Sequence, residues 1–195
     1  MDQDVLRQAS AGMSAVMIAG MLGRSVFLRL RGVAAHAVGQ GKSNRVQRVL
    51  VIGAGVILVY VIGRAYFPVL DMWLGARPSP APQLSLAAMI FGAVIMLISQ
   101  WGMSGSWRVG VPETDGHVEA LVTGGMHRFS RNPFYLGVMI YLTGVLLAAP
   151  GPLTAAGVFV AFVGLNIIIR QEEKYLEHRF GADYAAYKKR VRRWI

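Results

Sequence analysis

Cysteine is absent from the 195-residue chain, and charged residues make up only 15% of it. Without a thiol, the chain cannot form a disulfide, a thiolate metal site or a cysteine nucleophile. A Gly-x-Gly-x-x-Gly fingerprint is also missing, which disfavours a Rossmann nucleotide-binding domain. The four histidines are far apart and form no helix-spaced pair, so we predict no metal site.

Apolar residues dominate what is present. They make up 54% of the chain, and the mean hydropathy is +0.46. This composition predicts an all-α integral membrane protein. The apolar runs predict about five transmembrane helices, at 9–23 (continuing to 30), 49–67, 84–101, 133–149 and 153–169. Arg64 lies close enough to the end of its run for its side chain to reach the opposite interface.

Small residues recur every fourth position in the first run, at Ala15, Ala19 and Gly23. This stripe permits close helix packing in lipid, either within one chain or between two. It therefore leaves the oligomeric state open.

The net charge of +10 is distributed unevenly. With five spans, seventeen of the 20 lysines and arginines fall on one side, and only Arg7, Arg64 and Arg77 fall on the other. The positive-inside rule then places the N-terminus outside and the C-terminus in the cytoplasm, and we expect a bacterial inner membrane. Because topology accounts for the basic excess and no nucleic-acid motif is present, we expect no nucleic-acid partner.

Two regions are predicted along the chain. Residues 1–101 form a three-span membrane region with a basic cytoplasmic connector, and residues 102–195 form a catalytic region. The second region contains a polar loop, a helical hairpin closed by Pro150-Gly151-Pro152, and a C-terminal amphipathic helix broken at Gly181. That last helix either lies in the membrane interface or packs on the polar loops.

The chain changes from polar to apolar at 124–137. Asn132-Pro133 predicts a helix start, with the asparagine side chain as cap and proline in the first helical position. His127, Arg128 and Arg131 come just before it, and a helix N-terminus with basic neighbours suits a carboxylate or phosphate. The alternative is a capped membrane helix with interfacial arginines.

The tight hairpin should bring the cytoplasmic ends of the last two spans together. The residues expected to meet there are Arg131, Asn132, Tyr135, Arg170, Glu172 and Glu173. Such a cluster can hold a zwitterion, with its carboxylate on an arginine or the helix start and its ammonium on a glutamate. An interfacial salt bridge that ends a helix remains the alternative.

These residues carry a family resemblance. The run from Gly125 to Gly137 resembles the Arg-His-Pro-x-Tyr-x-Gly signature of the isoprenylcysteine carboxyl methyltransferase and phospholipid methyltransferase superfamily. The run from Arg170 to Val191 is similar to the second signature of that superfamily. Asn132 replaces the usual histidine, and His127 stands where tyrosine is frequent. We expect these departures to affect recognition of the acceptor and to leave binding of the cofactor largely intact.

The resemblance implies a membrane enzyme that binds S-adenosylmethionine, releases S-adenosylhomocysteine, and methylates a lipophilic or prenylated acceptor, with a carboxylate favoured. It also implies a cytoplasmic cofactor pocket formed by the last two spans and the C-terminal segment. The implied cofactor-binding residues are His127, Arg131, Asn132, Pro133, Tyr135, Leu136, Gly137, Glu172 and Glu173. The implied catalytic residues are Arg170 and Glu173.

The acceptor decides which residues the chemistry needs. A carboxylate requires no general base at neutral pH, and Arg170 would orient it bidentately. An amine or thiol must lose a proton, which makes Glu173 or His127 a candidate base. A phospholipid N-methyltransferase and a non-enzymatic membrane protein, such as a transporter subunit, are the alternatives. No charged residue lies at mid-depth in the predicted spans, which disfavours an ion or proton path.

Overall fold

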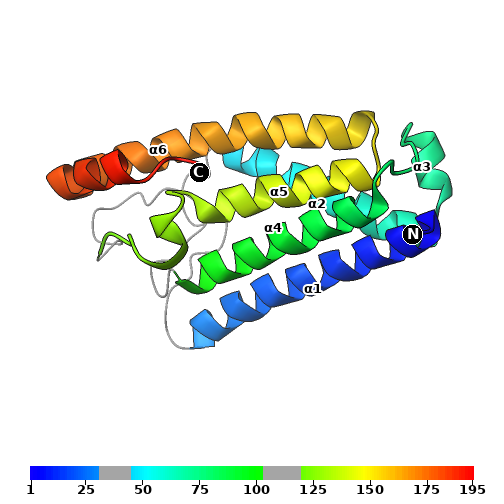
Figure 1. The fold of residues 1–195 in the computed structure, drawn as a ribbon, viewed down its shortest axis with the longest axis horizontal. Helices are drawn as coiled ribbons and strands as arrows, with labels where there is room; N and C mark the ends of the chain where they lie inside the picture. Colours follow the sequence, from blue (N-terminus) through cyan, green and yellow to red (C-terminus); the bar gives the residue numbers. More distant parts are fainter. Residues whose placement is uncertain (31–44, 103–119) are drawn as a thin grey trace.

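The computed structural model describes residues 1–30, 45–102 and 120–195. Five long helices make an antiparallel bundle in these ranges: α1 (Gln3–Leu30), α2 (Arg45–Tyr66), α4 (Pro82–Gly102), α5 (Pro133–Ala148) and α6 (Pro152–Arg190). Two short elements lie at the ends, α3 (Val69–Trp73) and the 3-10 helix η2 (Gly125–Arg128) (Figure 1). The all-α prediction is confirmed for the described ranges.

Four of the helices are long and apolar enough to cross a membrane: α1 (as Gln3–Phe27), α2, α4 and α6. They support an integral membrane protein. The predicted fourth span, α5, is shorter at 16 residues and extends about 24 Å, whereas a bilayer core is about 30 Å thick. The first helix begins earlier than predicted, at Gln3, and it ends at Leu30, the limit predicted for its continuation.

The helices alternate in direction, so the connections collect at two ends (Figure 1). The N-terminus, α3 and the turn between α5 and α6 lie at one end, which we call the α3 end. The last residues of α1 and α4, the start of α5, η2 and the second half of α6 lie at the other, the η2 end. Much of the predicted basic connector (31–44) and of the polar loop (103–119) falls outside the described residues.

Close helix packing occurs between α4 and α5, where glycines allow the backbones to touch. A Cβ atom on Gly137 would lie 2.8 Å from the Gly92 carbonyl oxygen, and one on Gly144 would lie 2.7 Å from the Met89 backbone nitrogen. The stripe predicted on α1 does not pack on the described residues. Ala15 and Ala19 are exposed, and a Cβ on Gly23 would have no atom within 4 Å.

A buried polar cluster closes the α3 end. Arg64, 1% exposed, donates to both carboxylate oxygens of Asp71 at 2.8 Å. Tyr60 and Arg7 donate to the same carboxylate at 2.8 and 2.9 Å. Arg64 is therefore buried against Asp71 at the end of the bundle, where the carboxylate neutralises its charge, and its reach to the interface stays a prediction. This cluster ties α1, α2 and α3 together.

Candidate functional site

The first signature meets α6 at the η2 end, where α5 begins. Pro133 is the first residue of α5, as predicted, and it is buried. The predicted cap is wrong, because the Asn132 side chain makes no hydrogen bond to the first turn. Its amide nitrogen instead donates to the Arg193 carbonyl at 3.3 Å. The Asn132 side chain therefore bonds the C-terminal segment and not the first turn of α5.

Glu173 joins the two signatures. Its carboxylate, in a residue only 7% exposed, forms an ion pair with Arg131, whose Nη2 lies 2.8 Å from Oε1. Arg193 donates to the same carboxylate through Nε at 3.1 Å and Nη2 at 2.6 Å. The expected pairing of Arg131 with a glutamate is thus present, and it holds a second arginine from the chain terminus. Hydrogen bonding to Glu173 raises the pKa of Arg193.

Tyr135 and Glu172 form a second link between α5 and α6. The tyrosine hydroxyl donates to Glu172 Oε1 at 2.6 Å. Glu172 lies just beyond the apolar part of α6, which ends at Ile169. Burial raises the pKa of Glu172 to about 7, with the Glu173 charge adding to the rise and the Tyr135 hydroxyl opposing it. This carboxyl group therefore titrates near neutral pH.

Two predicted residues stand apart from these contacts. Arg170 is exposed on α6 and forms no ion pair with a described residue. His127 is half-buried in η2, where its carbonyl accepts from the Tyr187 hydroxyl at 2.7 Å. Burial lowers the pKa of the His127 imidazole, so it is mostly neutral at pH 7.

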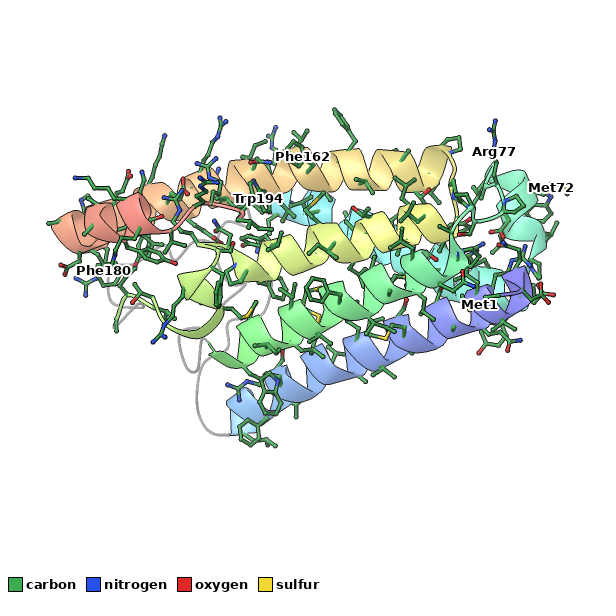
Figure 2. All side chains as sticks on the ribbon, in the orientation of Figure 1. Met1, Met72, Arg77, Phe162, Phe180 and Trp194 are labelled. Atoms are coloured by element: carbon green, nitrogen blue, oxygen red, sulfur yellow. The ribbon has the colours of Figure 1, made fainter. Side chains whose placement is uncertain are left out.

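The C-terminal segment 191–195 folds back over the start of α5, which sequence reasoning did not predict. The Arg131 N–H donates to the Arg192 carbonyl at 3.0 Å, and Ser130 Oγ donates to the Arg193 carbonyl at 3.1 Å. The Trp194 ring stacks on Phe162 of α6 with centroids 6.5 Å apart (Figure 2). No sequence signal marked Arg193.

The second half of α6 packs on the protein. The predicted break is present, because Gly181 has a φ of 46°. Beyond it, Tyr184 and Tyr187 are 1% and 3% exposed. These buried rings favour the packing alternative over a helix lying in the membrane interface.

Some buried polar atoms at the η2 end lack partners among the described residues. Arg131 Nε and Tyr175 Oη have no hydrogen-bond partner in the described part of the chain. Native proteins pair most buried polar atoms, so unpaired ones in a charged cluster suit a ligand that supplies the missing groups. With Glu172 and Arg131, the site offers both signs of charge and therefore fits a zwitterionic ligand. Leu136 is half-buried beside it, and Gly137 faces α4.

Comparisons with known proteins agree with these motifs. The phospholipid methyltransferase family profile matches residues 82–183, more than half of the chain. Protein-S-isoprenylcysteine O-methyltransferase of Saccharomyces cerevisiae is 32% identical over 112 residues, which cover 52% of this chain and 46% of that protein. The protein of the same name from Dictyostelium discoideum is 28% identical over 106 residues, covering 53% and 44%.

An uncharacterized protein of Haemophilus influenzae is 37% identical over 62 residues, which are 31% of this chain and 98% of that protein. The chain spans slightly less than half the length of the two named relatives. The matched region contains α4, α5 and most of α6, and so includes the first signature and the second as far as residue 183. The chain belongs to the phospholipid methyltransferase family.

Proposed function

We propose that this protein is an S-adenosylmethionine-dependent methyltransferase whose acceptor is a lipophilic molecule, with the carboxylate of an isoprenylated cysteine favoured. The observation that carries the proposal is the Arg131–Glu173–Arg193 cluster. It joins the two signatures at the end of the last two apolar helices. The names of the relatives support the reaction type and the acceptor class.

The methyl donor would lie between α5 and α6 at the η2 end. When bound, S-adenosylmethionine would supply a methyl group from its positively charged sulfur. The acceptor would displace that sulfur in line, and S-adenosylhomocysteine would leave as a neutral thioether. Glu172 would hold its ammonium or ribose hydroxyls, and the unpaired Nε of Arg131 would hold its carboxylate. The remaining lining residues in this proposal are His127, Asn132, Pro133, Tyr135, Leu136 and Gly137. Glu173 positions Arg131 for the carboxylate.

Arg170 would receive the acceptor. Its guanidinium is exposed one residue after the apolar part of α6, where a lipid tail in the bilayer would place a carboxylate head. A guanidinium orients a carboxylate with two parallel hydrogen bonds, which lysine cannot reproduce. A carboxylate needs no base, whereas an amine acceptor would use His127, whose imidazole is mostly neutral at pH 7.

The proposed placement puts the η2 end in the cytoplasm of a bacterial cell, where S-adenosylmethionine is made. The distribution of lysines and arginines supports this orientation. The N-terminus would then lie outside the inner membrane.

Calorimetric titration of the detergent-purified protein with S-adenosylhomocysteine tests the donor site. We expect saturable binding, weakened about tenfold by Glu172→Gln because the charged hydrogen bond is lost. Glu177→Gln is the matched control, since Glu177 is an exposed carboxylate on the same helix. Absence of binding in a folded sample, tested also in lipid nanodiscs, would contradict the proposal and favour a structural or transport role.

A phospholipid N-methyltransferase is the second candidate, because the matched family carries that name. Membranes would be incubated with methyl-labelled donor and either S-farnesylcysteine or phosphatidylethanolamine. Alkali releases the label from a methyl ester as methanol but leaves a methylamine intact. We expect alkali-labile label on S-farnesylcysteine, and we expect Arg170→Lys to lower turnover more than donor affinity. Stable label on phosphatidylethanolamine would assign the second function.

A further inference from the structure

Gln100 is a buried polar residue that the proposed site does not use. It lies near the end of α4 and is 0% exposed, and neither Oε1 nor Nε2 has a hydrogen-bond partner in the described ranges. Leaving both ends of a buried amide unpaired is costly, and most buried amides are bonded. The side chain therefore calls for a group that is not part of the described chain.

The packing of α4 on α5 shows where Gln100 points. A Cβ atom built on Gly144 would contact Met89, and one built on Gly137 would contact Met96. Gln100 continues the same face of α4 one turn beyond Met96. Because α4 and α5 are antiparallel, each step forward on α4 meets a step back on α5, so Gln100 lies level with Pro133, the first residue of α5.

The neighbouring positions of α4 face another helix. Leu97 is the residue that a Cβ on Gly20 of α1 would meet, and the Trp101 ring lies 5.4 Å from the Arg24 guanidinium carbon. Gln100 is thus directed to the start of α5, which the Asn132 side chain leaves uncapped. Arg131 Nε, two residues before Pro133, is another buried atom without a partner among the described residues, as is Arg24 Nε on α1.

We propose that Gln100 binds the adenine edge of the methyl donor. The charged side chains of the site lie on α6, its C-terminal extension and the start of α5, and they suit the amino-acid end of the donor. Gln100 approaches the start of α5 from α4 and is neutral. Its amide offers one acceptor beside one donor, which match the exocyclic N–H and the adjacent ring nitrogen of adenine. This inference rests on the proposed function.

The test removes each side of this contact in turn. Gln100→Met keeps the length of the side chain and removes the amide, and Gln83→Met makes the same change at an exposed position of α4. Calorimetry would measure binding of S-adenosylhomocysteine and of its analogue with hydrogen in place of the exocyclic amine. We expect wild type and Gln83→Met to bind the analogue about tenfold more weakly than S-adenosylhomocysteine. Gln100→Met should bind both ligands with the same weakened affinity.

Stability without ligand is the second readout. Because Gln100 has no described partner, Gln100→Met should not lower the melting temperature of the ligand-free protein, whereas a structural amide would. Gln100→Met that binds S-adenosylhomocysteine as tightly as wild type, keeps the tenfold preference for the amine, or melts earlier without ligand would overturn the inference and leave the proposed function standing. A wild type that binds no S-adenosylhomocysteine would remove both.

Discussion

The two ends of the bundle each hold an arginine bonded to a buried carboxylate, but they differ in whether every buried polar atom of the cluster has a partner. At the α3 end, Asp71 bonds Arg64 through two 2.8 Å contacts, and Tyr60 and Arg7 take up its remaining capacity. At the η2 end, Glu173 contacts both Arg131 and Arg193, yet the buried Nε of Arg131 has no partner among the described residues.

This difference separates a structural cluster from a binding cluster. A buried ion pair whose members all have partners needs no further group, and it fixes the helices that supply them. A cluster with unpaired buried atoms is stable only at a cost, which a ligand can offset. The comparison therefore favours a stabilising role for the α3 end and supports the proposed binding site at the η2 end.

Asp71→Asn is the strongest way to break the comparison. It would leave the Arg64 charge buried without an anion, so we expect a loss of about 3–5 kcal/mol in the free energy of unfolding. Asp4→Asn, which alters an exposed partner of Arg7, should cost less than about 1 kcal/mol. Unfolding in detergent followed by circular dichroism would measure both. Equal losses, or weakened S-adenosylhomocysteine binding by the folded Asp71 variant, would contradict a purely structural role.

Gly144→Ala and Gly137→Ala sharpen the comparison along one interface. Each added methyl would lie within 3 Å of the α4 backbone, so each should destabilise the protein by about 1–3 kcal/mol. Gly137 is one turn into α5 from the site, whereas Gly144 is three turns in. Calorimetry should show weaker S-adenosylhomocysteine binding only for Gly137→Ala, and the same binding loss in both would mean that the α3 end also shapes the site.

The fold was largely predictable because single residues dictated it. Pro133 and Pro152 each mark a helix start, and Gly181 marks the break in α6. The glycines that determine close packing were not predictable. The every-fourth stripe from Ala15 to Gly23 looked like a packing face, yet the contact uses Gly92 and Gly137. Spacing alone cannot tell which face of a membrane helix meets a neighbour, because lipid is as apolar as a partner helix.

The sequence predicted only that part of the candidate site in which the two signatures meet. Arg131 and Glu173 were placed together because the hairpin forces α5 and α6 to be antiparallel. The loss of the Asn132 cap and the position of Arg193 depend on how residues 191–195 fold back, and no local pattern specifies that fold. No sequence pattern marked Gln100, and only its burial and its register on α4 led to the role proposed for it.

Arg193→Gln probes the C-terminal half of the binding cluster. Glu173 would keep Arg131 but lose two charged hydrogen bonds from a partly exposed partner. We expect about 1 kcal/mol less stability and several-fold weaker S-adenosylhomocysteine binding. Arg190→Gln changes an exposed arginine nearby and should alter neither. If the two variants behave alike in calorimetry and thermal unfolding, the segment 191–195 does not support the site.

The smallest expected effect is a pH dependence of S-adenosylhomocysteine binding, which should depend on the η2 end and not on the α3 end. Because burial raises the pKa of Glu172 to about 7, its carboxylate is about one-tenth ionised at pH 6 and nine-tenths ionised at pH 8. The ammonium of S-adenosylhomocysteine binds the ionised form, so its affinity for the wild type should rise up to about tenfold between these values. Glu172→Gln should abolish that rise, whereas Asp4→Asn at the α3 end should keep it. A flat or falling affinity in calorimetry of the wild type would show that Glu172 does not hold the ammonium.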